Sequence, residues 1–183
     1  MNTLGLDIST AIVGWTILDD QFNIIKMSHI DFKKCKTFWE KVDYAVSELT
    51  KILTQNQVDN VYVEESLMRF SPGFSSASTI ITLAKFNVLI SYAVRNAQGT
   101  EPQYVGANDA RRKCGIKLLQ KKKVGIDYKT QAFNWCKAGP LSHLQFPLTK
   151  TGKIKPFVMD ETDSYIIARA GVILISEAKN GSL

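Results

Sequence analysis

The sequence predicts an α/β domain with a mixed five-stranded sheet flanked by helices. Three short apolar runs, separated by turns, occupy residues 1–31 and predict an antiparallel meander of three strands. An amphipathic helical pattern then precedes a β-branched run at 58–65, the order expected of a crossover to a parallel strand. With 183 residues and 45% hydrophobic side chains, residues 1–183 are expected to form a single domain with its own core.

The first strand, within residues 1–10, is expected to deliver the carboxylate of Asp7 at its end. Residues 13–18 and 22–31 complete the predicted meander. A carboxylate in an apolar strand is costly to bury unless it is paired, hydrogen-bonded or bound to a cation. Taken alone, Asp7 is a strand-end residue that faces solvent or caps a turn.

A helix is predicted from about 38 to 55. Thr37 and Glu40 have the spacing of a capping box, and apolar residues continue after them at helical intervals. This helix is expected to pack on the sheet. The β-branched and aromatic run at 58–65 is suited to a buried central strand, which Glu64 ends.

Residues 66–78 are predicted to be a loop that carries Arg69, Phe70 and Phe74. These three side chains either pack as a small satellite cluster or contact DNA, with the aromatic rings stacked on bases. The helix predicted at 79–97 is apolar around nearly its whole circumference, which is typical of a helix buried on both sides. Its second side meets either another layer of the same domain or a second subunit.

The remainder of the chain alternates short elements with turns before one long helix. The predicted elements are a strand at 102–105, a short helix capped by Asn108 or Asp109, a lysine-rich loop at 121–123, a helix at 129–137, an irregular stretch at 138–157 with a basic turn at 150–153, and a final helix at 159–178.

The net charge of +6 is unevenly distributed along the chain. Residues 111–183 hold fourteen Lys and Arg against five Asp and Glu, whereas residues 1–60 hold six against eight. Such asymmetry indicates a polyanionic partner, the alternative being a solvated basic surface. The side chains expected to contact DNA phosphates here are Arg111, Arg112, Lys113, Lys117, Lys121, Lys122, Lys123, Lys150 and Lys153, with Lys155 beside them.

Composition also bears on the compartment. No stretch is expected to reach the length of a membrane span, and the N-terminus lacks the pattern of a signal peptide, so no membrane partner is expected. Three scattered cysteines, Cys35, Cys114 and Cys136, form neither a disulfide framework nor a zinc-binding spacing. A reducing, cytoplasmic location is therefore expected.

Acidic residues recur where the predicted elements converge. Asp160 and Asp163 open the final helix on one face, where acids alone would compensate the helix dipole. A right-handed crossover places the strand at 58–65 beside the first strand, so Asp7 and Glu64 emerge at the same edge of the sheet. The final helix can complete a cluster of four carboxylates. Such oxygen-only sites suit Mg²⁺ or Mn²⁺, and two ions per site promote phosphodiester cleavage.

Four stretches, in this order, resemble the RuvC family of Holliday junction resolvases. They are Leu4–Ser9, Gly14–Ile17, Val63–Glu65, and the Asp160-x-x-Asp163 pair with the small and apolar residues up to Ala168. The resemblance covers nearly the whole chain in element order, and the Asp-x-x-Asp pair is its most specific part. It implies an RNase H-like fold, a homodimer, and Mg²⁺-dependent cleavage of four-way DNA junctions.

The resemblance also implies roles for individual residues. Asp7, Glu64, Asp160 and Asp163 match the metal-binding acids of the family, which are its catalytic centre. Lys129 lies where the family has a catalytically helpful lysine, and Lys113 is a looser match to a second one.

The sequence departs from the family pattern at three places. Ile8-Ser9 replaces the usual Pro-Gly after the first Asp, and Leu67 stands where the family has a stacking aromatic. The stretch at 138–157 is longer than the family's connection. These departures bear on junction-sequence preference and on strictness for four-way junctions. Compact, divergent members of this kind are often phage-encoded, in which case the compartment is the host cytoplasm.

The function expected from these observations is that of a structure-selective endodeoxyribonuclease in DNA recombination and repair, which resolves Holliday junctions or other branched DNA. Three alternatives stay open. One is a module that grips branched DNA without cutting it. Another is an RNase H-like nuclease that acts on flaps or RNA–DNA hybrids. The third, a sugar-kinase or actin-like ATPase, needs a duplicated domain, and 183 residues leave room for one copy.

Overall fold

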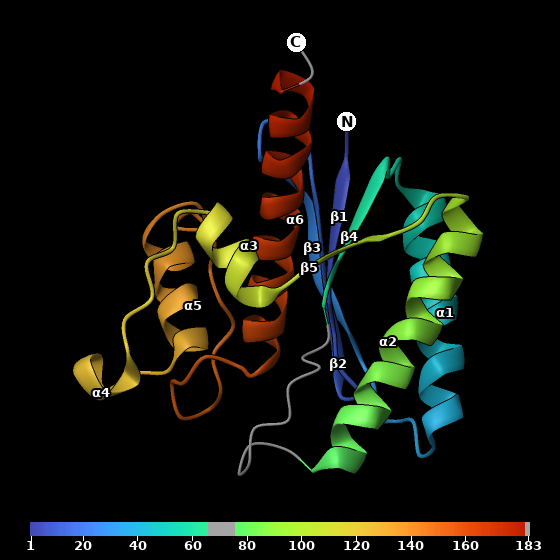
Figure 1. The fold of residues 1–183 in the computed structure, drawn as a ribbon. Helices are drawn as coiled ribbons and strands as arrows, with labels where there is room; N and C mark the ends of the chain where they lie inside the picture. Colours follow the sequence, from blue (N-terminus) through green and yellow to red (C-terminus); the bar gives the residue numbers. More distant parts are fainter. Residues whose placement is uncertain (66–75, 182–183) are drawn as a thin grey trace.

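The computed structural model describes residues 1–65 and 76–181, and its strands form one mixed sheet in the order β3-β2-β1-β4-β5 (Figure 1). The strands are β1 (Thr3–Ile8), β2 (Ile12–Leu18), β3 (Ile24–Asp31), β4 (Asn60–Glu64) and β5 (Gln103–Val105). β1, β2 and β3 form the predicted antiparallel meander, and β4 lies parallel to β1 and to β5. The predicted crossover is therefore confirmed.

Helices cover both faces of this sheet (Figure 1). They are α1 (Phe38–Gln55), α2 (Ala77–Gln98), α3 (Ala107–Lys113), α4 (Lys121–Val124), α5 (Tyr128–Ala138) and α6 (Phe157–Asn180). α1 and α2 pack together on one face, while α6 lies along β1, β2 and β4 on the other and carries α3 and α5 behind it. The acids at the start of α6 are thereby brought onto the sheet.

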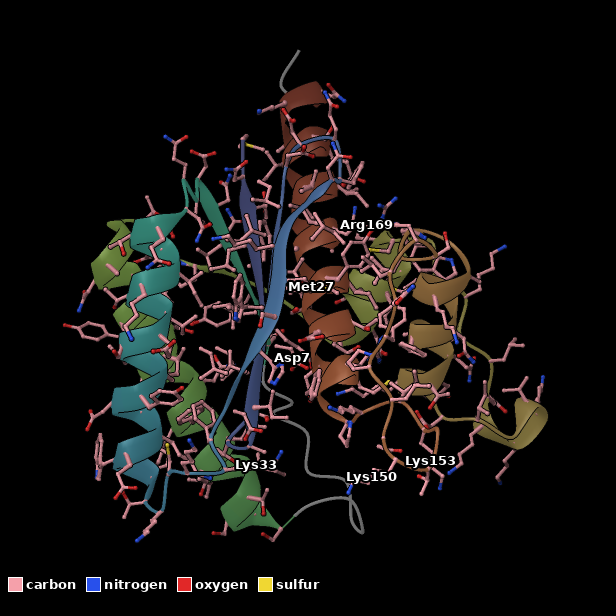
Figure 2. All side chains as sticks on the ribbon, turned by 180° about the vertical axis from the view of Figure 1, so that it is seen from behind. Asp7, Met27, Lys33, Lys150, Lys153 and Arg169 are labelled. Carbon is pink, nitrogen blue, oxygen red and sulfur yellow. The ribbon has the colours of Figure 1, made fainter. Side chains whose placement is uncertain are left out.

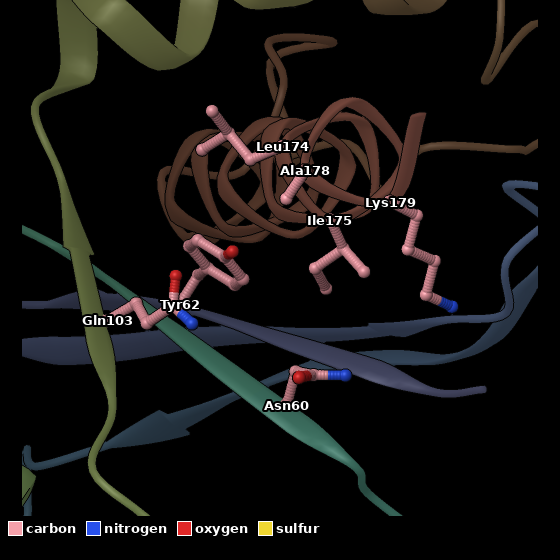
Figure 3. A pocket seen from close by; sticks show the side chains of 7 residues that line it. All are labelled: Asn60, Tyr62, Gln103, Leu174, Ile175, Ala178 and Lys179. Carbon is pink, nitrogen blue, oxygen red and sulfur yellow. The ribbon is translucent and has the colours of Figure 1, made fainter. Parts of the chain in front are cut away.

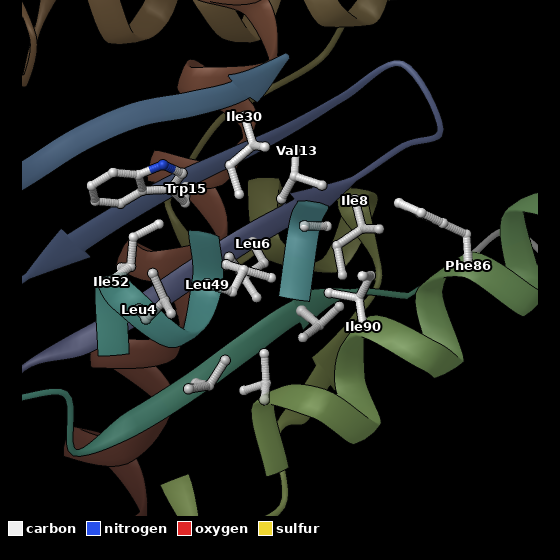
Figure 4. Close-up of a cluster of buried hydrophobic side chains, with 14 of the residues drawn as sticks. Leu4, Leu6, Ile8, Val13, Trp15, Ile30, Leu49, Ile52, Phe86 and Ile90 are labelled. Atoms are coloured by element: carbon white, nitrogen blue, oxygen red, sulfur yellow. The ribbon is translucent and has the colours of Figure 1, made fainter. Parts of the chain in front are cut away.

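Alternation along the strands divides the core between these two faces. Leu4, Leu6 and Ile8 point toward α1 and α2, where they form one buried apolar cluster (Figure 4). Successive side chains of a strand point to opposite faces, so Asp7 points toward α6. The same alternation in β4 sends Glu64 to the α6 side. Both predicted acids therefore share one face of the sheet.

Local sequence signals account for most of the element boundaries. The capping box that begins α1 is present, since the Thr37 hydroxyl accepts from the Glu40 backbone N–H and the Glu40 carboxylate accepts from the Thr37 backbone N–H. α6 begins two residues earlier and ends two residues later than predicted. All three cysteines are free.

Two local predictions were wrong. Neither Asn108 nor Asp109 caps α3, because its N-cap is Gly106 and the Asp109 carboxylate binds Arg112 instead. The predicted loop at 121–123 is the single-turn helix α4, which Gly125 ends in a left-handed conformation at φ 76°.

α2 is covered on only one side. Its buried positions include Phe86, Ile90 and Val94, whereas Ile81, Val88 and Tyr92 are 54%, 64% and 59% exposed. Within residues 1–65 and 76–181, the prediction of burial on both sides does not hold. By length and composition alone, α2 also qualifies as a membrane-spanning helix, so the expectation that no stretch reaches that length was wrong. In this fold its buried face packs against α1 and the sheet core.

Candidate active site

Asp7 and Glu64 reach the site because they end two adjacent parallel strands. Leu6 of β1 is paired with Val63 of β4, so the two acids that follow occupy neighbouring positions at the C-terminal ends of these strands. The end of β4 is also held from the α2 side, where the buried Asn87 side chain donates to the Glu64 carbonyl at 3.1 Å.

α6 approaches the sheet closely because two glycines face it. A Cβ atom at Gly14, opposite Asp7 in the β1–β2 register, would collide with the Asp160 backbone. A Cβ atom at Gly5 would collide with the α6 backbone at Ala168. The hydroxyls of Thr16 in β2 and Ser164 in α6 are hydrogen-bonded at 2.8 Å. These contacts place the first turns of α6, with Asp160 and Asp163, over the end of β1.

Lys129 enters the cluster from α5. The Asp127 carboxylate caps this helix by accepting from the Thr130 backbone N–H at 2.8 Å, which sets Lys129 in the first turn. The Lys129 Nζ atom lies 2.9 Å from Asp160 Oδ1 and 3.1 Å from Asp163 Oδ2. It also lies 3.9 Å from Asp7 Oδ2. One ammonium group is thus shared by three carboxylates.

Arg111 belongs to the acid cluster rather than to the exposed basic surface. Its guanidinium donates to Asp163 Oδ1 at 3.2 Å, and the two side chains are only 12% and 7% exposed. α3 packs on α6 and turns this side chain inward, away from the exposed basic residues with which the sequence analysis grouped it, and its contact with phosphates stays a prediction.

Lys113, at the end of α3, lies beside a part of α6 that is too far from the acid cluster for it to be a second lysine there. It pairs with Glu177. Glu177 follows Asp163 by fourteen residues, which is roughly 21 Å of helix at 1.5 Å per residue. Its looser match to a catalytic lysine is therefore not supported by the geometry.

The pKa values of the acids reflect this crowding. Burial, then the negative charges of Glu64 and Asp163, raise the pKa of Asp7 well above its ordinary value. Burial and the Asp163 charge raise the pKa of Glu64 to about 7, against partial compensation by Arg111 and Lys129. Burial alone would lower the pKa of Lys129, but the surrounding carboxylates, Asp163 foremost, raise it well above the ordinary value.

The donor set fits a hard divalent cation. Four carboxylates against the cations Lys129 and Arg111 leave a formal charge of −2, which is the charge that one such ion would neutralise. Within residues 1–65 and 76–181, no three carboxylate, imidazole or thiol side chains converge as a ready-made metal site. The Lys129 ammonium lies between Asp7, Asp160 and Asp163, so an ion would bind beside it or take its place.

The other predicted DNA-binding residues lie on the surface where the structure describes them. Their side chains are exposed: Arg112, Lys113, Lys117, Lys121, Lys122, Lys123, Lys150 and Lys153. α4, with its three lysines, projects from the body of the domain (Figure 1). Figure 2 shows Lys150 and Lys153 at the lower end of the molecule, below Asp7. Arg69, Phe70 and Phe74 lie outside the described residues.

Sequence reasoning missed a second anchor of α6. His29 in β3 pairs with Glu161, with Nδ1 2.7 Å from Oε1, and its ring stacks on Phe157 with a centroid distance of 4.1 Å. His29 is paired with Gly14, which is itself paired with Asp7. The polar side chain of His29 therefore lies on the α6 face, in the same cross-strand row as Asp7. This position was the signal that could have identified His29 as an anchor. The anchor fixes the residue next to Asp160.

A separate depression of about 840 Å³ lies at the opposite end of the sheet (Figure 3). It is lined by Asn60, Tyr62, Gln103, Leu174, Ile175, Ala178 and Lys179. None of the clustered acids lines it, so it offers no argument for catalysis.

Comparison with known proteins gives structural matches only: no protein-family model and no curated protein sequence matches the chain. The structure of Thermus thermophilus RuvC matches with a TM-score of 0.67 and 14% identity over 97% of each chain. T. thermophilus RuvC in complex with a Holliday junction substrate matches with a TM-score of 0.63 and 14% identity, over 97% of this chain and 96% of that one. The yeast mitochondrial Holliday junction resolvase Ydc2 matches with a TM-score of 0.63 and 13% identity, over 97% of this chain and 80% of that one.

These likenesses confirm the resemblance to the RuvC resolvases at the level of the fold. The chain has an RNase H-like α/β fold, with a mixed five-stranded sheet flanked by helices.

Proposed function

We propose that this chain is a metal-dependent, structure-selective endodeoxyribonuclease that acts on branched DNA, with Holliday junctions as its foremost substrate. The observation that carries the proposal is the gathering of Asp7, Glu64, Asp160 and Asp163 at one end of an RNase H-like sheet. Of the matched structures, one is a Holliday junction resolvase by name and another is a RuvC in complex with a Holliday junction substrate, which supports branched DNA as the substrate class.

In this proposal the four acids hold Mg²⁺, or Mn²⁺ in its place. A bound ion would supply the activation of water and the stabilisation of the leaving oxygen. Glu64 must be ionised to act as a ligand, and its pKa of about 7 means that metal binding releases a proton near neutral pH. Once Lys129 leaves the cluster, the four carboxylates and Arg111 carry a formal charge of −3, and a DNA phosphate would add the further negative charge that two divalent ions, as the sequence analysis expects, would balance.

In this proposal Lys129 has a second role, as a contact to the DNA. It is 41% exposed, so its ammonium can turn from the carboxylates to an oxygen of the scissile phosphate when DNA arrives. Phosphate contacts remote from the cluster are assigned to the exposed side chains of Lys117, Lys121–Lys123, Lys150 and Lys153. The compartment proposed is the cytoplasm, or that of a host cell for a phage protein.

We propose further that the protein is a homodimer joined by the α2 stripe, which consists of Ile81, Val88 and Tyr92. These large apolar side chains are exposed in one chain, and a two-fold dimer would present two sites to a two-fold symmetric junction. Sedimentation of the wild type at micromolar concentration should show a dimer, and Val88→Glu should shift it to a monomer. A wild-type monomer that still cuts junctions would contradict the dimer.

A panel of labelled substrates tests the proposed activity. A four-way junction, a flap, a Y-fork and an RNA–DNA hybrid are each incubated with Mg²⁺, with Asp7→Asn as the control for contaminating nucleases. We expect junction cleavage by the wild type that Asp7→Asn abolishes. Binding without cleavage in Mg²⁺ or Mn²⁺ would favour the non-cutting module, and preferential cleavage of the hybrid or flap would reassign the substrate.

A further inference from the structure

The segment that joins β3 to α1 lies at the same end of the sheet as the acid cluster. β3 runs in the same direction as β1, because each is antiparallel to β2. Both strands therefore terminate at this end of the sheet. Asp31, at the end of β3, is two strands away from β1 and two residues beyond the cross-strand row of Asp7. At about 4.8 Å per strand and 3.3 Å per residue, this places Asp31 roughly 12 Å from Asp7.

Backbone contacts hold this segment against the turn that follows Asp7. The Phe32 backbone N–H donates to the Ala11 carbonyl at 3.1 Å. The Lys41 ammonium donates to the Thr10 carbonyl at 2.7 Å. The Glu40 carboxylate accepts from the Lys36 backbone N–H at 2.6 Å as part of the capping arrangement of α1. The segment therefore has a defined position relative to the site.

The segment presents positive charge to solvent. Lys33, Lys34 and Lys36 are exposed, Lys33 at 83% of its side chain, and Asp31 is paired with Lys33 at 2.9 Å. Of the acids that balance these charges in the sequence, Asp31 and Glu40 lie at the two ends of the segment, with Asp31 paired to Lys33, whereas three others are remote in the fold. Asp19 and Asp20 lie in the β2–β3 turn and Asp59 binds the Asn2 backbone, at the opposite edge of the sheet.

The same segment exposes an aromatic ring. Trp39 is 63% exposed, and its ring makes a T-shaped contact with Phe38, with ring centroids 5.5 Å apart. Trp15 is buried at 9% exposure. A large π-face beside three lysines is the combination that binds the backbone and the bases of unpaired DNA.

We propose that the β3–α1 segment, residues 33–39, is a second DNA-contacting surface, on the other side of the acid cluster from Lys150 and Lys153. In Figure 2, Lys33 lies at the lower left and these two lysines at the lower right, with Asp7 above them, nearer the centre of the molecule. Lys33, Lys34 and Lys36 bind phosphates about four base steps from the cleavage site, at 3.4 Å per step. Trp39 stacks on a base left unpaired at the branch point. The inference rests on the proposed action on branched DNA.

The charge part is tested by junction binding in Ca²⁺ over a salt series. Lys33→Ala, Lys34→Ala and Lys36→Ala are combined in one variant, and Lys26→Ala, Lys51→Ala and Lys179→Ala form a control that loses the same charge away from the site. We expect the first variant to bind about 100-fold more weakly at 0.1 M salt, with a log–log salt slope smaller by about 2 to 3. The control should match the wild type.

The stacking part is tested with Trp39→Ala and Trp39→Phe. We expect Trp39→Ala to bind a junction about tenfold more weakly with an unchanged salt slope, while Trp39→Phe retains most of the affinity. Junction binding should protect wild-type tryptophan fluorescence from acrylamide, and Trp39→Phe should lose that protection.

The outcomes separate this inference from the proposed function. If the wild type binds and cuts junctions while the variant lacking Lys33, Lys34 and Lys36 behaves like its control, the phosphate contacts are overturned. If Trp39→Ala binds like the wild type, the stacking is overturned. A wild type that binds no branched DNA would overturn the proposed function and this inference with it.

Discussion

In the metal-free protein, replacing Glu64 by Gln is expected to stabilise the fold at pH 8 and to change little at pH 4. The pKa of Glu64 is raised from 4.5 to about 7, so the folded state disfavours the ionised form. The resulting destabilisation of the wild type is absent below pH 4.5, grows between pH 4.5 and 7, and is complete above pH 7. At 1.36 kcal/mol per unit, the shift corresponds to at most about 3 kcal/mol.

The assay is urea unfolding in EDTA at pH 4, 6 and 8, with Glu65→Gln as the control, because Glu65 is the exposed neighbour. For a chain of this size, about 3 kcal/mol also corresponds to a rise in melting temperature of roughly 6–12 °C at pH 8. Mg²⁺ should stabilise the wild type more than Glu64→Gln, since the amide is a poorer ligand. If Glu64→Gln is no more stable than the wild type at pH 8 in EDTA, the crowding of acids inferred from the geometry is wrong.

The remaining predictions concern the charges around the same cluster. Lys129→Met should lower the metal-free stability by about 1–2 kcal/mol, given the partial exposure of the lysine. In calorimetry without DNA, the same variant should bind Mg²⁺ more tightly than the wild type. Weaker binding would contradict the position of Lys129 between the acids. Asp163→Asn should destabilise by about 3 kcal/mol because it leaves Arg111 buried and unpaired, whereas Asp7→Asn should be neutral or stabilising, as thermal unfolding in EDTA would show. Replacing Lys121, Lys122 and Lys123 by Ala should weaken binding to all branched DNAs alike and reduce the salt slope by about 0.9 per lost contact, and an unchanged slope would make α4 a solvated surface.

Local rules were sufficient for the sheet and for the acids. Period-two alternation places Asp7 and Glu64 on one face, and the handedness of the crossover makes their strands neighbours. The spacing of Asp160 and Asp163 puts both on one side of α6. Each of these inferences needs only the order of the elements and the geometry within one element.

Packing between helices was beyond those rules. Arg111 was grouped with the exposed lysines because a charge count along residues 111–129 does not show which side of α3 faces α6. Lys33 and its neighbours were overlooked as a DNA-contacting surface because a charge count over residues 1–60 includes acids that the fold places at the opposite end of the sheet. The close approach of α6, which Gly14 permits, also depends on a contact between residues far apart in sequence.

The two cations of the cluster differ in a way that bears on how an ion enters. Arg111 is 12% exposed, is held by the packing of α3 on α6, and, among the described residues, donates to Asp163. Lys129 is 41% exposed and is shared by Asp7, Asp160 and Asp163. Removing the Arg111 charge would require α3 to move, whereas the Lys129 side chain can rotate toward solvent. In the proposed metal-bound state, Arg111 would therefore remain as the counter-charge, and a divalent ion would take the place of Lys129 from its exposed side.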